Sequence, residues 1–114
     1  MVNELEKKFD KDMINIYWEA KRELNYTASR FMQLILEKGG LRAAKQLITK
    51  DGGTSEFTTL YEMGRLDLSV EAHVLKPEYK ELFTEEEREI CRGRLKKYGY
   101  KAWWRGENYG LLHN

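Results

Sequence analysis

The stretch from Leu5 to Leu24 reads LEKKFDKDMINIYWEAKREL, with an apolar residue at every third or fourth position. This spacing places apolar side chains on one face of an α-helix and leaves the charged residues between them for the solvent. The stripe consists of Leu5, Phe9, Met13, Ile16, Ala20 and Leu24, and Tyr17 and Trp18 widen it. The pattern predicts a long amphipathic helix packed on a core, and with it an all-α fold.

Two glycine pairs divide the next part of the chain. We expect one helix from about Thr27, whose hydroxyl can cap it, to Gly39-Gly40, and another over residues 41–49, before Gly52-Gly53. Glycine is expected at such ends because a helix commonly finishes in a left-handed residue that only glycine adopts without steric cost. An ordinary helical hairpin is favoured over a DNA-binding helix-turn-helix, since the second helix offers few polar side chains that could reach bases.

Two short buried helices are predicted after this hairpin. The first is capped by Thr54 or Ser55 and the second by Asp67 or Ser69, because these side chains accept hydrogen bonds from free N–H groups at a helix start. Pro77 prevents the second from continuing. A single-turn connector should follow, up to position 83.

The run Thr84-Glu85-Glu86-Glu87 predicts the start of the last helix. Thr84 and Glu87 have the spacing of a capping box, and the acidic residues oppose the positive end of the helix dipole. We expect the helix to end before Gly99. The residues predicted to point inward are Ile90, Leu95 and Tyr98, with Cys91 beside them.

Length and composition fit one domain of about five to six helices. The chain has 114 residues, of which 41% are hydrophobic and 34% charged, and this is a globular composition. We assign residues 1–114 to a single compact helical bundle, with a core over about 5–99 and an aromatic tail over 100–114. The 20 basic residues nearly balance the 19 acidic ones, so the net charge gives no general pull toward nucleic acid.

The cysteine content and the hydropathy pattern favour the cytoplasm. Cys91 is the only cysteine, which excludes an intramolecular disulfide and fits a reducing compartment. The sequence contains no apolar stretch long enough for a secretory signal or a membrane span, so no membrane partner is expected.

Four stretches resemble a widespread bacterial family of small uncharacterised proteins. They are GGLRAAKQL at 39–47, FTTLYEMGRLDLSVEA at 57–72, LFTEEE at 82–87 and YGY at 98–100. The resemblance covers residues 9–100 and implies a self-contained domain of bacterial, cytoplasmic origin. It transfers no activity, cofactor or catalytic residue, and the tail after Tyr100 lies outside it.

The most enzyme-like set of residues lies between positions 62 and 73. It consists of Glu62, Arg65, Asp67, Glu71 and His73. Glu71 and His73 are two apart on a predicted helix and therefore face about 200° apart, so the set does not converge on one point. We favour a structural explanation, in which Asp67 caps a helix and pairs with Arg65 while His73 is a satisfied or exposed side chain. A small enzyme using this region is the third hypothesis.

No catalytic residue, metal ligand or cofactor site is predicted elsewhere. Cys91 lies on the apolar stripe of the last helix, where a free cysteine is usually a small buried hydrophobe. The only other histidine, His113, lacks the spacing that a two-histidine zinc motif requires.

The C-terminal end carries the remaining signal. From Arg92 to Arg105 every charged residue is basic, and aromatic residues alternate with them. The candidate contact residues are Arg94, Lys97, Lys101, Trp103, Trp104 and Arg105. The favoured hypothesis is a non-enzymatic interaction or accessory domain, in which Trp103 and Trp104 anchor a contact with this chain, a second copy or another protein. The alternative is a nucleic-acid-binding module, since basic and aromatic side chains together bind single strands.

Overall fold

The computed structural model describes residues 3–100, and these residues form helices and connecting turns without a strand. The helices are α1 (Glu4–Leu24), α2 (Ser29–Lys38), α3 (Gly40–Ile48), α4 (Ser55–Glu62), α5 (Val70–Val74) and α6 (Glu85–Lys97), with 3₁₀ turns η1 (Leu66–Leu68) and η2 (Pro77–Leu82). The predicted all-α fold of about five to six helices is confirmed. Among residues 3–100, none of the helices combines the length and the apolar character that spanning a bilayer requires.

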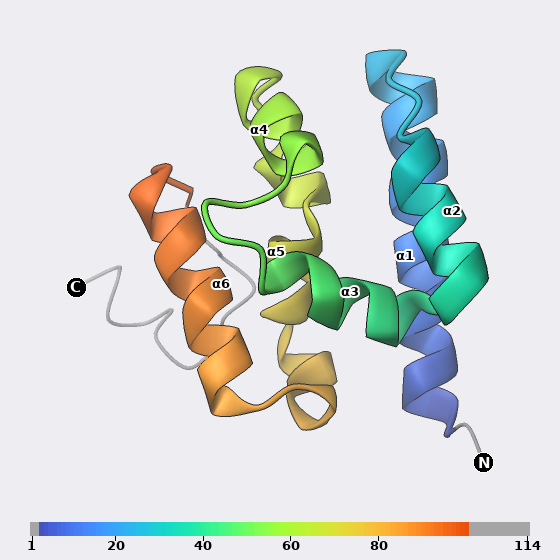
Figure 1. Ribbon diagram of the computed structural model, residues 1–114, viewed down its shortest axis with the longest axis vertical. Helices are drawn as coiled ribbons and strands as arrows, with labels where there is room; N and C mark the ends of the chain where they lie inside the picture. Colours follow the sequence, from blue (N-terminus) through green and yellow to red (C-terminus); the bar gives the residue numbers. More distant parts are fainter. Residues whose placement is uncertain (1–2, 101–114) are drawn as a thin grey trace.

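Helix α3 joins two parts of the bundle. Figure 1 shows α1 and α2 side by side, α3 crossing below α2, and α5 and α6 on the far side of α3. Helix α3 contacts α1, α2, α5 and α6, whereas α4 packs mainly on η1. Lys45 Nζ on α3 also lies 2.8 Å from Glu87 Oε1 on α6, so an ion pair reinforces the contact between α3 and α6.

Helix α1 buries the apolar stripe that its sequence predicts. Phe9, Met13, Ile16 and Ala20 are buried, and Trp18, which widens the stripe, is half exposed. The Asn3 side chain accepts a hydrogen bond from Glu6 N and caps the start. Asn25, in the left-handed conformation at φ 54°, ends the helix.

The turn between α2 and α3 brings α3 against α1. Gly39 has φ 86°, as expected of a glycine that ends a helix. Gly40 touches α1 so closely that an added Cβ would lie 2.9 Å from Asp10 Cα and 2.6 Å from Asp10 Oδ1. The same Asp10 Oδ1 accepts a hydrogen bond from Leu41 N at 3.2 Å. The prediction that Thr27 caps α2 is wrong, because Ala28 occupies the cap position without a side-chain hydrogen bond.

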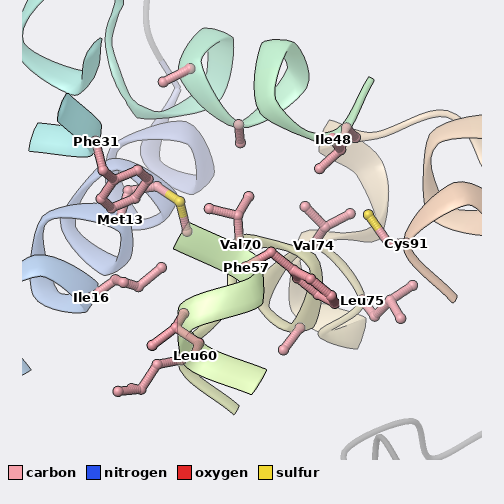
Figure 2. Close-up of a cluster of buried hydrophobic side chains, with 14 of the residues drawn as sticks. Met13, Ile16, Phe31, Ile48, Phe57, Leu60, Val70, Val74, Leu75 and Cys91 are labelled. Carbon is pink, nitrogen blue, oxygen red and sulfur yellow. The ribbon is translucent and has the colours of Figure 1, made fainter. Parts of the chain in front are cut away.

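Helix α5 lies at the centre of the molecule, and all five of its residues are buried. Figure 2 shows Val70 and Val74 of α5 among Met13, Ile48 and Phe57. Of the two predicted caps, Ser69 is the one used, and its hydroxyl accepts a hydrogen bond from Ala72 N at 3.1 Å. Asp67 instead lies on the surface.

Helix α6 begins with the predicted capping box. Glu87 N donates to Thr84 Oγ1, and Thr84 N donates to Glu87 Oε1. The buried face runs through Arg88, Cys91 and Leu95. The prediction that Ile90 points inward is wrong, because one residue along a helix rotates a side chain by about 100° away from Cys91.

Candidate interaction surface

The structure places two of the six candidate contact residues. Arg94 and Lys97 lie in the last turns of α6. The other four, Lys101, Trp103, Trp104 and Arg105, lie outside the described residues. The site is therefore built from α6 and its neighbours.

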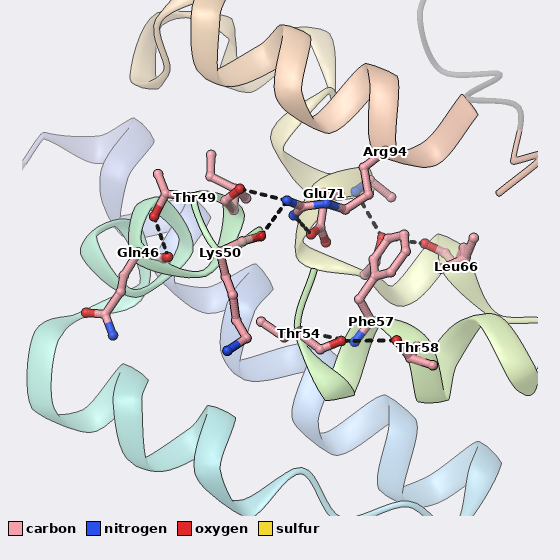
Figure 3. A network of polar contacts seen from close by, with 12 residues as sticks. Gln46, Thr49, Lys50, Thr54, Phe57, Thr58, Leu66, Glu71 and Arg94 are labelled. Atoms are coloured by element: carbon pink, nitrogen blue, oxygen red, sulfur yellow. Dashed lines mark hydrogen bonds and ion pairs between the residues drawn. The ribbon is translucent and has the colours of Figure 1, made fainter. Parts of the chain in front are cut away.

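Arg94 turns into the protein and connects three elements. Its Nη1 donates to Glu71 Oε2 at 2.7 Å, and its Nη2 donates to Ile48 O at 3.1 Å and to Lys50 O at 2.8 Å (Figure 3). Only 10% of the Arg94 side chain and 4% of the Glu71 side chain are exposed. The guanidinium thus satisfies carbonyls at the end of α3 and a carboxylate of α5.

Burial raises the pKa of Glu71 above its ordinary value, although the hydrogen bond and charge of Arg94 favour the carboxylate. The cost of removing the carboxylate from water is therefore substantial. Arg94 is the cation positioned to offset it.

The remaining basic side chains of α6 divide into two kinds. Arg92 forms ion pairs with Glu89 at 2.9 Å and with Glu85 at 3.3 Å. Lys96 and Lys97 are exposed, and neither has an ion-pair partner among residues 3–100. The basic character that α6 presents to the solvent comes mainly from these two lysines.

The outward side of α6 carries a surface hollow of about 280 Å³. It is lined by Gly52, Glu89, Ile90, Gly93, Arg94, Lys97 and Tyr98. Gly93, in the middle of the helix, is one of these lining residues, and a Cβ added there would meet nothing within 4 Å. Ile90 is 38% exposed beside it. We call the residues Glu89, Ile90, Gly93 and Lys97 the Gly93 face.

A second hollow, of about 180 Å³, lies at the end of α6. It is lined by Tyr61, Gly64, Leu66, Tyr98, Gly99 and Tyr100, so it shares Tyr98 with the first hollow. The rings of Tyr61 and Tyr98 meet edge to face with centroids 4.8 Å apart, and Tyr61 is exposed. The chain leaves the described part at Tyr100, which belongs to this hollow.

The residues of the enzyme hypothesis are engaged separately. Arg65 donates to Asp67 at 2.9 and 3.0 Å and to Glu23 at 2.7 Å, which ties η1 to α1. Glu71 is held by Arg94 as described above, and Glu62 is exposed on α4. The predicted pairing of Asp67 with Arg65 is present.

His73 is buried rather than exposed. Its Nδ1 lies 2.8 Å from Ser69 O, so in the neutral form this nitrogen carries the proton and donates. Burial lowers the pKa of His73, and the positive charge of Lys76 acts in the same direction. The ring is therefore neutral at physiological pH and satisfied by the backbone.

Cys91 is fully buried, and burial raises the pKa of its thiol well above the ordinary value. A thiol with so little thiolate is a poor nucleophile. Among residues 3–100 no group of three or more His, Cys, Asp or Glu side chains is arranged to hold a metal ion.

An apolar crevice behind α4 offers little room. It runs between Phe57 and Leu60 of α4 and residues such as Ile16 and Phe31, and its free volume is about 30 Å³. That is about the volume one water molecule takes in the liquid.

Comparison with known proteins identifies no relative. No protein-family description, curated protein or solved structure matches the chain. The resemblance to a bacterial family stays a prediction.

Besides the inward turn of Arg94, sequence reasoning missed two features of α6. Arg88 is buried, with 6% of its side chain exposed, and its Nε has no hydrogen-bond partner within the described part of the chain. The open position of Gly93 was missed as well. Both features could have been predicted from the position of Cys91. Arg88, three residues before it, and Leu95, four residues after it, lie on the same buried side of the helix, whereas Ile90 and Gly93 do not.

Proposed function

We propose that the chain is a non-enzymatic interaction domain of the bacterial cytoplasm, and that α6 together with the segment following it forms the contact surface. The observation that carries this proposal is the Gly93 face. An exposed isoleucine lies there beside an open helical glycine, in a hollow that shares Tyr98 with the second hollow at the end of the helix.

Gly93 lies in the middle of α6, where glycine is less favourable than other residues. It costs about 0.5–1 kcal/mol of folding stability relative to alanine. No neighbouring side chain or backbone occupies the space where its Cβ would lie. The missing side chain leaves room for a second molecule to approach the helix backbone closely. Small residues play this part where two helices pack against each other.

Residues beyond Tyr100 extend this surface under the proposal. The proposal gives Trp103 and Trp104, which lie outside the described residues, the role of anchors, because tryptophan buries a large apolar area at contacts.

Site-specific photo-crosslinking tests the proposal. The photoreactive residue p-benzoylphenylalanine replaces Ile90, and in a control it replaces Leu36, an exposed apolar residue on α2. In the cells that make the protein we expect a discrete protein adduct from position 90, lost on Lys97→Glu, and none from position 36. Equal adducts from both positions, or none from position 90, would contradict the proposal.

Nucleic-acid binding is the second candidate, supported by the exposed Lys96 and Lys97. It is weaker because two of the basic residues of α6, Arg92 and Arg94, are held by carboxylates. An adduct from position 90 that consists of nucleic acid would support this candidate instead.

A further inference from the structure

We propose that the partner of the Gly93 face is a second copy of this chain, with the two α6 helices packed antiparallel about a two-fold axis at Gly93. This inference rests on the proposed function and names its partner. It is carried by the order of charges along α6 and by the open glycine at their centre.

Glu89, Gly93 and Lys97 are four residues apart, so they lie on one side of the helix. In an antiparallel pair centred on Gly93, Glu89 of each copy lies opposite Lys97 of the other. Two symmetric ion pairs result. A parallel pair would place Glu89 opposite Glu89 and Lys97 opposite Lys97, so the charges select the antiparallel arrangement.

The shape of the surface fits the same arrangement. The absence of a Cβ at Gly93 lets the two helix backbones approach at the crossing point. Ile90, one turn away on the flank of the hollow, then packs against the hollow of the other copy. An isoleucine that is exposed in the single chain thereby loses contact with water.

The contact between the two α6 helices is small, which limits the affinity expected of the dimer. Helix α6 has 13 residues, and so measures about 20 Å. A single pair of such helices covers less than the roughly 800 Å² per partner of a standard stable interface. The dimer should therefore be weak and should form with rising protein concentration.

Sedimentation equilibrium on the purified chain, at low and high micromolar concentration, tests the dimer. Lys97→Glu and Glu89→Lys each replace two attractions between the copies by two repulsions, and each should weaken dimerisation about tenfold. Glu89→Lys also removes the ion pair of Glu89 with Arg92 on the same helix, so Lys97→Glu is the cleaner of the two single variants. The double variant Glu89→Lys/Lys97→Glu restores opposite charges and should recover an affinity within about threefold of the wild type.

Lys38→Glu is the matched control, since Lys38 is also an exposed lysine in the last turn of a helix, α2. It should leave the dimer unchanged, and circular dichroism should show all variants folded. A wild type that stays monomeric overturns the inference, as does a double variant no better than the single ones. The proposed function survives such a result if position 90 still crosslinks to another protein, and falls with it if position 90 gives no adduct.

Discussion

Arg94 Nη1 on α6 lies 2.7 Å from Glu71 Oε2 on α5, in an ion pair that is nearly closed to solvent. The same guanidinium binds two carbonyls at the end of α3. One side chain from the predicted contact set thus holds together the three helices at the centre of the fold, and it turns its charge away from the surface that α6 presents.

Breaking this pair should be costly. Arg94→Met leaves Glu71 buried without its cation and removes the donors to Ile48 O and Lys50 O, so urea unfolding should show a loss of about 3–5 kcal/mol. Lys97→Met changes an exposed residue three positions after Arg94, and it should alter stability by no more than about 0.5 kcal/mol. Similar losses in both variants would refute the structural role of Arg94.

The approach of α3 to α1 predicts a large effect of a small substitution. Gly40→Ala places a methyl group 2.9 Å from the Asp10 backbone, which cannot shift without moving α1. We expect a loss of about 1–3 kcal/mol in urea unfolding. A neutral or stabilising Gly40→Ala would show that the two helices are further apart than described.

The buried thiol of Cys91 should not react with thiol reagents while the protein is folded. Because burial raises the pKa of Cys91, a disulfide reagent such as Ellman's should label it only as the chain unfolds. Cys91→Ala should cost about 1–2 kcal/mol through lost packing and leave binding unchanged. Rapid labelling of the native protein, or a stable variant without function, would revive a chemical role.

The buried histidine should make the fold sensitive to mild acid. The pKa of His73 is lowered by burial and by Lys76, against the opposing effects of Ser69 O, Asp12 and Asp67. The unfolded chain therefore takes up a proton near the ordinary pKa of about 6.5, before the folded chain does. Stability should be full above that pH and fall below it as the folded pKa is approached.

The measurement for this prediction is urea unfolding at pH 7.5 and 5.5. His73→Gln should lose less stability than the wild type between these two values. Equal losses would mean that other groups control the acid sensitivity.

The C-terminal segment separates the two candidate functions. If nucleic acid is the partner, replacing Lys97, Lys101 and Arg105 by Gln should weaken binding and flatten its salt dependence. If the segment anchors a protein contact, Trp103→Ala or Trp104→Ala should dissociate the complex instead. We expect no electrophoretic shift of DNA or RNA by the wild type at low salt, and a shift there would favour nucleic acid.

Local signals predicted much of the fold. The stripe from Phe9 to Ala20 and the pairing of Thr84 with Glu87 depend on near neighbours in sequence, and both are present. Helix α5 has no exposed side, so helical periodicity cannot show which neighbours bury Glu71 and His73. The roles of Arg94 and Gly40 depend on residues 23 or more positions away, and no local pattern reveals them.

Gly93→Ala provides the most direct test that the glycine is kept for a contact. The substitution removes the helix cost of glycine and meets no atom within the chain, so stability in urea at low protein concentration should rise by about 0.5–1 kcal/mol. The added methyl group obstructs the close approach of another helix, so sedimentation equilibrium of the same variant should show weaker association. Higher stability with unchanged or tighter association would contradict the account.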